Sequence, residues 1–100
     1  MDERFLRTRM LIGEAGQAAL TRASVAVFGA GGVGGAVIEA LARSGIGRLD
    51  IIDGDTFSLS NLNRQLLAVE QTVGKSKTEV AKERVLSINP QAKVTERKIF

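Results

Sequence analysis

The sequence of 100 residues contains no cysteine, histidine, tryptophan or tyrosine, and only one proline. Without cysteine the chain has no disulfide framework, no thiolate metal site and no cysteine nucleophile. Aromatic residues make up only 4% of the chain and all are phenylalanine, so platforms for stacking nucleic-acid bases are scarce. These absences exclude a disulfide-rich secreted domain and cysteine-based catalysis.

Long apolar runs are missing as well. None approaches the roughly 20 apolar residues that a membrane-spanning helix needs. The first ten residues, MDERFLRTRM, carry charges of both signs and do not resemble a secretory signal. We therefore expect a cytoplasmic protein with no membrane partner.

The charge balance is mildly basic, with 14 Lys and Arg against 11 Asp and Glu. A net charge of +3 suits phosphate-bearing ligands but is too small to indicate nucleic-acid binding by itself. We expect no DNA partner, and an RNA partner is expected to bind outside these residues. The apolar fraction of 44% is typical of a globular domain, and the length is that of one small domain or part of a larger one.

An N-terminal arm, residues 1–23, precedes the main fold. It is predicted to form two short helices broken near Gly13, whose apolar side consists of Leu11, Ile12, Ala15, Ala19 and Leu20. Arg4, Arg7 and Arg9 give the arm a basic cluster. The cluster is either a solvated face or the source of an arginine that reaches into a nucleotide site, possibly in another subunit.

Strand and helix signals alternate over residues 24–100. A buried strand is predicted at 24–29, and further strands are predicted at 48–55 and, from a loose alternation of polar and apolar residues, at 92–99. A helix is predicted from Gly32 to Ser44, with Val33, Val37 and Leu41 on its apolar face and a Glu39–Arg43 pair on another. Between the second and third strands, residues 56–74 read as a long polar loop with a helical turn around 60–67.

A second helix is predicted between that loop and the third strand. Ser76 and Glu79 match a capping box at its start, and Pro90 ends it. Its apolar face is expected to contain Val80, Ala81, Val85 and Ile88.

The resulting β-α-β-α-β order predicts an α/β fold, the Rossmann-like half of a doubly wound parallel sheet. In the usual strand order 3-2-1-4-5-6 the first strand is central, so residues 24–29 would lack a neighbour on one edge. We therefore expect an N-terminal fragment of a longer enzyme, whose bare edge favours self-association.

The segment FGAGGVGGA, residues 28–36, holds five of the eleven glycines. Gly29, Gly31 and Gly34 fit the pattern G-x-G-x-x-G between a strand and a helix, with Gly32 as an additional glycine. In that position glycines allow a tight turn and a close approach to the backbone, and the helix N-terminus offers N–H groups to phosphate. The segment predicts a phosphate-binding loop.

Acidic and basic residues further along the chain refine this prediction. Asp53 follows the loop by about 20 residues, where a carboxylate accepts hydrogen bonds from ribose hydroxyls. Asp55 fits a ribose contact and a turn equally well. These features allow either NAD or ATP. Arg64 and Lys77 favour ATP, because cations near a phosphate loop neutralise a triphosphate and hydride transfer does not need them.

Several segments together resemble the ThiF/MoeB/HesA family, the bacterial relatives of ubiquitin-activating enzymes. They are RFLRT, GAGGVG, ARSGIGRLDIIDGD, NLNRQ, TVGKSK and INP, in the family's order and spacing. The resemblance covers essentially the whole chain. Within the family, RTRMLIGEAG, EALARSGIG and NLNRQLLA look most like the tRNA threonylcarbamoyladenosine dehydratases.

The resemblance implies an enzyme that uses Mg-ATP to adenylate a substrate carboxylate. In the dehydratase branch that carboxylate belongs to a modified adenosine in tRNA, and in the ThiF and MoeB branch it is the C-terminal glycine of a ubiquitin-like sulfur carrier. A homodimer is implied. Residues 24–100 would then form the N-terminal half of an adenylation domain, with the family's Mg²⁺-binding aspartate beyond them and no metal ligand within them.

The resemblance also assigns roles to individual residues. Lys77 would stabilise the transferring phosphoryl group, and Arg7, or Arg9 beside it, would be contributed across the dimer interface. The remaining positions would surround the nucleotide: Gly29, Gly31, Gly32, Gly34, Asp53, Asp55, Asn61, Arg64 and Gln65.

Two other functions remain open on the sequence. An NAD-dependent oxidoreductase would explain the glycine motif and Asp53 but not Arg64 and Lys77. A nucleotide-binding or dimerisation module without catalytic activity would also account for a chain that carries only part of the site.

Overall fold

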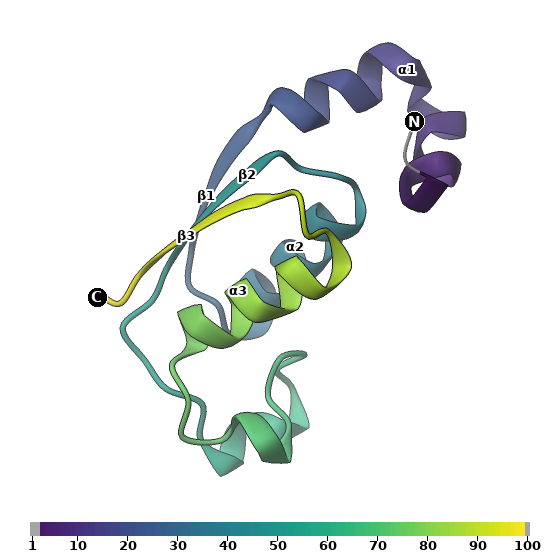
Figure 1. Ribbon diagram of the computed structural model, residues 1–100. Coiled ribbons are helices and arrows are strands. Elements are labelled where there is room, and N and C mark those ends of the chain that lie inside the picture. Colours follow the sequence, from purple (N-terminus) through teal and green to yellow (C-terminus); the bar gives the residue numbers. More distant parts are fainter. Residues whose placement is uncertain (1–2, 100) are drawn as a thin grey trace.

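The computed structural model describes residues 3–99, which form a three-stranded sheet with helices against it (Figure 1). In chain order the elements are the short 3₁₀ helix η1 (Glu3–Phe5), α1 (Leu6–Arg22), β1 (Ser24–Phe28), α2 (Gly32–Arg43), β2 (Arg48–Ile52), η2 (Leu59–Asn63), η3 (Glu70–Thr72), α3 (Lys77–Ile88) and β3 (Lys93–Arg97). No helix among these residues is long and apolar enough to cross a membrane.

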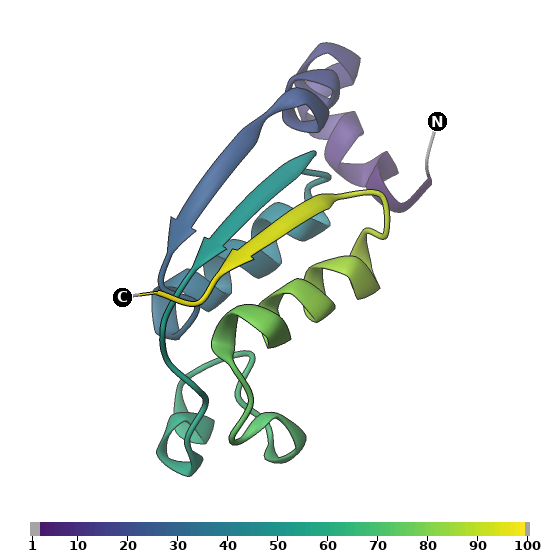
Figure 2. The same cartoon turned by 60° about the vertical axis from the view of Figure 1, so that its left-hand side comes forward.

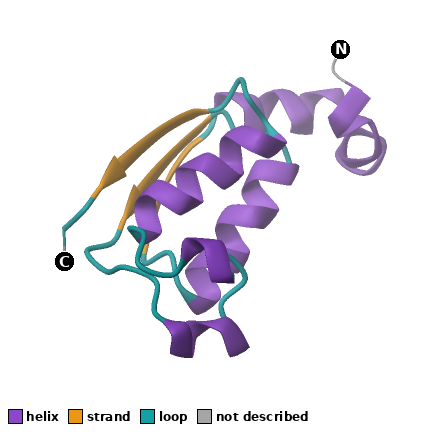
Figure 3. Cartoon of the chain, turned by 60° about the horizontal axis from the view of Figure 1, so that its bottom comes forward, coloured by secondary structure: helices purple, strands orange, loops and turns teal. Residues whose placement is uncertain are grey.

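The sheet is parallel, in the order β1-β2-β3. Both crossovers run in the same direction, and α2 and α3 therefore lie side by side on one face of the sheet (Figures 2 and 3). Among the described residues β1 is paired on one side only. This arrangement confirms the predicted Rossmann-like half, including the unpaired edge of the first strand.

The hydrophobic core lies between the sheet and the two helices. Leu49 and Ile51 of β2 are fully buried, as are Ile38 of α2 and Val85 of α3. The prediction that residues 24–29 form a buried strand was wrong. Alternate residues of β1 are exposed, and Phe28 is 80% exposed, because the described helices cover a single face.

Of the three apolar residues predicted for the face of α2, only Leu41 packs against the core. Gly35, Ile38 and Ala42 are buried, whereas Val33 is 82% and Val37 40% exposed. The buried face contains the glycine because α2 packs closely there: a Cβ atom at Gly35 would lie 3.3 Å from the carbonyl oxygen of Ala30.

The N-terminal arm is broken at Gly13, as predicted, where φ is +78°. Its predicted apolar side is not buried among the described residues: Leu11 is 88% exposed, and only Leu20 packs against the core. The reason is geometric, since the first half of α1 extends past the sheet and only the end that leads into β1 touches it (Figure 1).

Helix α3 begins directly after Ser76, as predicted, and buries Val80, Ala81 and Val85. The predicted capping box does not form. Instead, the hydroxyl groups of Ser76 and Thr78 hydrogen-bond each other at 2.9 Å. Strand β2 is shorter than predicted and ends at Ile52, which leaves residues 53–55 in the loop that follows.

Candidate functional site

The glycine loop joins β1 to α2 at the carboxyl end of the sheet. The structural reason for having a glycine differs from one position to the next. Gly29 adopts a φ of +95°, which side-chain-bearing residues rarely adopt. A Cβ atom at Gly34 would lie 1.7 Å from the carbonyl oxygen of Gly29, so this position is closed to any side chain. A Cβ atom at Gly32 would have no atom within 4 Å. The space in front of Gly32 is therefore open.

Helix α2 starts at Gly32, immediately after this turn. The first N–H groups of a helix have no partner within the helix and lie at the positive end of its dipole. No side chain caps this helix. The loop therefore offers backbone donors at an open surface, which is the arrangement that binds phosphate.

Asp53 connects the glycine loop to the loop that follows β2. One carboxylate oxygen accepts the N–H of Ala30 at 2.8 Å, and the other accepts the N–H of Asp55 at 2.8 Å. Asp53 thus holds both loops in place, and each oxygen keeps a lone pair for a further donor. The side chain of Asp55 is exposed.

Backbone pairing places Lys77 beside these two loops. The N–H of Lys77 donates to the carbonyl of Asp55 at 3.0 Å, and Phe57 exchanges hydrogen bonds with Lys75 and Gly74. Lys77 is only 8% exposed, and its ammonium lies 5.6 Å from the centroid of the Phe57 ring. A buried phenylalanine thus lies within cation–π distance of the predicted catalytic lysine.

Phe57 is a residue that the sequence did not single out. It is 1% exposed and among the largest fully buried side chains. Its one signal in the sequence is that it is the only aromatic residue in the polar stretch 56–74.

Gln65 is the member of the NLNRQ segment that reaches the glycine loop. A Cβ atom at Gly31 would lie 3.0 Å from Oε1 of Gln65, which places the amide directly against the loop backbone. This oxygen is buried and has no hydrogen-bond partner among the described residues. An unpaired acceptor next to the loop is available to a donor on a bound ligand.

Asn61 and Arg64 are held within their own turn. Asn61 is buried, and its side-chain oxygen accepts the N–H of Ser58. The exposed guanidinium of Arg64 donates to the carbonyl of Ser60 and to the side chain of Asn63, both at 3.0 Å. Neither side chain is hydrogen-bonded to the glycine loop.

The structure does not bring Arg7 to the site. This exposed residue lies on the first turn of α1, at the other end of the sheet from the glycine loop (Figure 1). Arg9, two residues further along α1, is half-buried, and one of its guanidinium nitrogens has no hydrogen-bond partner among residues 3–99. Residues 3–99 contain no group of three or more acidic, histidine or cysteine side chains that could hold a metal ion.

The sequence pattern of the ThiF family matches residues 5–99. The chain belongs to the ThiF family. It is 44% identical over all of its 100 residues to the tRNA threonylcarbamoyladenosine dehydratase of Bacillus subtilis, of which it spans 39%. Over 94 residues it is 40% identical to the sulfur carrier protein adenylyltransferase of Thermus thermophilus, spanning 35% of that protein.

Solved structures of this family share the fold closely. The tRNA N6-threonylcarbamoyladenosine dehydratase of E. coli in complex with ATP superposes with a TM-score of 0.96 at 43% identity, over 98% of this ThiF-family chain and 40% of that one. E. coli MccB with ATP gives a TM-score of 0.90 at 37% identity, over 100% and 32% of the two chains. The chain thus spans well under half of the proteins that it matches.

Proposed function

We propose that the whole protein is an ATP-dependent enzyme that adenylates the carboxylate of threonylcarbamoyladenosine in tRNA and so prepares it for cyclisation. The observation that carries this proposal is the hydrogen-bonded path from Ala30 through Asp53 and Asp55 to Lys77. This path supports a site in which the Asp53 carboxylate and Lys77 act together with the glycine loop. The relatives named after tRNA threonylcarbamoyladenosine support the choice of substrate.

In the proposed reaction a carboxylate oxygen of the substrate attacks the α-phosphorus of ATP. The bond from that phosphorus to the bridging oxygen breaks, and pyrophosphate leaves with the electron pair. An intramolecular attack on the acyl-adenylate then closes the ring and expels AMP, so that the carboxylate loses one oxygen to AMP. The protein's main contribution is electrostatic, because negative charge moves onto the leaving group.

The residues of the site would have different roles in this reaction. The N–H groups at Gly31 and Gly32 would hold phosphate, and Asp53, with Asp55 beside it, would accept the ribose hydroxyls. Lys77 would neutralise the charge of the transferring phosphoryl group.

The NLNRQ segment and the N-terminal arm complete the proposed site. Gln65 would lie beside the phosphates, with its unpaired Oε1 accepting from a donor on the nucleotide, and Asn61 would keep the turn in shape. Arg64 would swing from its turn to the phosphates. Arg7 would come from the partner subunit of a homodimer, since in its own chain it lies at the far end of the sheet.

The described residues do not offer a metal-binding cluster, and both oxygens of Asp53 already accept backbone N–H groups. We therefore assign no step to Mg²⁺ here. An Mg²⁺ ion bound with ATP would take most of its ligands from phosphate oxygens and water.

A sulfur-carrier protein is the second candidate substrate, favoured by the 40% identity to an adenylyltransferase of that type. The same half-reaction would take place on its C-terminal carboxylate. Two solved structures of a dehydratase relative contain ATP and AMP, and this favours ATP over the NAD alternative.

ATP–pyrophosphate exchange with the whole protein tests the proposal. We expect exchange that depends on tRNA carrying threonylcarbamoyladenosine. Exchange only with a sulfur-carrier protein would select the second candidate, and no exchange with either would indicate a module without this activity.

Substitution of the two cations tests their assigned roles. Lys77→Ala and Arg64→Ala should each lower the exchange rate by at least about 100-fold, the scale of a lost electrostatic contact in a transition state. Lys82→Ala, a change of the same type within helix α3, is the control and should retain the rate. Unchanged exchange in Lys77→Ala and Arg64→Ala would remove the roles given to them.

A further inference from the structure

The end of the sheet opposite the glycine loop carries a group of cations that the site does not use. We define this basic surface by the six cations that line two adjoining pockets, of about 410 and 360 Å³: Arg4, Arg22, Arg43, Arg48, Arg84 and Lys93. Both pockets include Phe5, and among residues 3–99 no acidic residue lines either of them. Six of the 14 basic residues of the chain are therefore gathered at one end.

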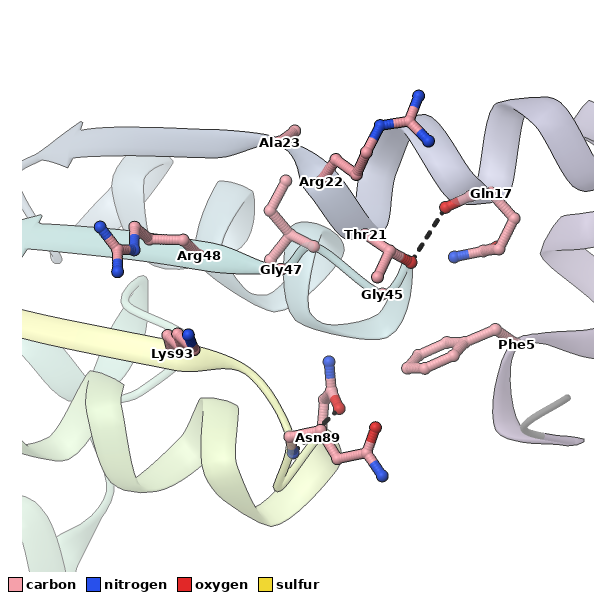
Figure 4. A pocket seen from close by; sticks show the side chains of 12 residues that line it. Phe5, Gln17, Thr21, Arg22, Ala23, Gly45, Gly47, Arg48, Asn89 and Lys93 are labelled. Atoms are coloured by element: carbon pink, nitrogen blue, oxygen red, sulfur yellow. Dashed lines mark hydrogen bonds between the residues drawn. The ribbon is translucent and has the colours of Figure 1, made fainter.

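The first pocket is built around the beginnings of the strands (Figure 4). Arg48 and Lys93 are register partners, the first residues of β2 and β3, and both are exposed. Arg22, at the end of α1, also lines this pocket. Like charges directly opposite on neighbouring strands repel each other, and an anion bound between them would remove this cost.

The second pocket lies where α2 and α3 approach η1. Glu39 accepts hydrogen bonds from Arg84 at 2.6 Å and from Arg43 at 3.1 Å. The glutamate side chain is only 13% exposed, whereas those of Arg43 and Arg84 are 58% and 44% exposed. One carboxylate thus holds two guanidinium groups at the surface, and their donors are not exhausted.

The wall of the first pocket is polar. Gln17 is 6% exposed and donates to the carbonyl of Ser44 at 3.0 Å, while its Oε1 has no donor among the described residues. Asn89, also buried, forms another part of the wall. Amides and cations without carboxylates suit a ligand that combines phosphate with hydroxyl groups.

We propose that this basic surface binds the phosphodiester backbone of the substrate tRNA. The proposal rests on the proposed function, which supplies the partner. A single phosphate would need one pocket, whereas the cations extend over two, as successive backbone phosphates require. From the small net charge we expected an RNA partner to bind outside these residues. Composition alone does not reveal that six basic residues share one end of the molecule.

The test is the affinity of the whole protein for substrate tRNA, measured by fluorescence anisotropy between 50 and 200 mM KCl without ATP. The variant replaces the register pair together, Arg48→Gln with Lys93→Gln. We expect weaker binding and a plot of log Kd against log salt that is shallower by about two, one for each cation removed. The control, Lys82→Gln with Lys98→Gln, removes the same charge outside both pockets and should bind as the wild type does.

Kinetics separate docking from catalysis. In the Arg48, Lys93 variant KM for tRNA should rise while kcat and the affinity for ATP stay unchanged. Equal tRNA affinity in variant and wild type, or an equal loss in the control, would overturn the proposal. So would a wild-type protein that adenylates a sulfur carrier and does not bind tRNA. If tRNA binds and the variant weakens it but no exchange occurs, the surface is supported and the proposed function falls.

Discussion

Gly32 and Gly34 are two residues apart in the first turn of α2, yet a methyl group added to each would meet entirely different surroundings. At Gly34 it would overlap the carbonyl oxygen of Gly29, whereas at Gly32 it would project into open space. Packing within the chain therefore explains one glycine and leaves the other unexplained. We interpret Gly32 as the position that ligand, rather than protein, approaches.

The pair gives a prediction with its own control. Gly32→Ala should fold with an unchanged or slightly higher melting temperature, because alanine favours helix, and should weaken ATP binding at least tenfold. Gly34→Ala should lose more than about 2 kcal/mol of stability, since the backbone must move. Thermal melts and calorimetric titration with ATP measure both effects. Wild-type ATP affinity in Gly32→Ala would contradict our interpretation of this loop.

The candidate site shows how far single residues can be predicted from sequence. The glycine loop, Asp53 and Gln65 do lie together in the structure, because their spacing follows from the order of strands and helices. The use of Asp53 as a backbone acceptor, and the place of Phe57 beneath Lys77, depend on contacts between segments far apart in the chain. No local pattern encodes them.

Among the elements, α2 and α3 are joined at their surface by Glu39. Arg84 donates to both of its carboxylate oxygens, and Arg43 completes the predicted pair one turn along α2. The hydrogen bond from Arg84 is the main reason that the pKa of Glu39 lies below its ordinary value. The charged form of Glu39 is therefore favoured by folding.

Glu39→Gln should cost about 1 kcal/mol or less at pH 7, the range of partly exposed ion pairs. The stabilisation is fully present above the pKa of Glu39 in the unfolded chain, about 4.3, and is lost as the pH falls through the lower pKa of the folded state. Urea unfolding at pH 7 and at low pH measures the difference from wild type, which should shrink in acid. Glu79→Gln, an exposed acid on α3, is the control. A difference that is the same at both pH values would refute this account.

At this scale the sequence predicts the kind and order of the elements, but not which faces they bury. The apolar period of α2 pointed to Val33, Val37 and Leu41, yet Gly35 faces the core. Periodicity detects only apolar side chains. It cannot detect Gly35, where α2 packs closely because the residue has no side chain. For the N-terminal arm the prediction named apolar residues that are not buried, because this part of the chain extends past the sheet.

At the scale of the whole molecule, the sheet has an unpaired edge strand among the described residues. Among residues 3–99 β1 is hydrogen-bonded to β2 only, so its other edge presents unpaired backbone groups beside an exposed Phe28. Unpaired, partly apolar edges pair with other chains. Residues 1–100 alone should therefore associate as their concentration rises.

Ala26→Lys tests this expectation. Ala26 is exposed in the middle of β1 and lies opposite Asp50, so a lysine is tolerated there and opposes edge pairing. We expect sedimentation velocity to show a shift from associated species toward monomer. Lys82→Ala, away from the edge, should not change the distribution. A wild-type chain that stays monomeric at high concentration would exclude the edge as an association site.

The parallel sheet also determines when this fold can form. Every strand pairing spans an intervening helix, α2 between β1 and β2 and α3 between β2 and β3, so the described chain contains no hairpin. A ribosome releases the first strand long before its neighbours, and non-local pairings carry the cost of closing large loops. Leu49 and Ile51 therefore stay without a complete core until α3 and β3 have been synthesised. This part of the fold therefore assembles only after the segment up to β3 has been synthesised.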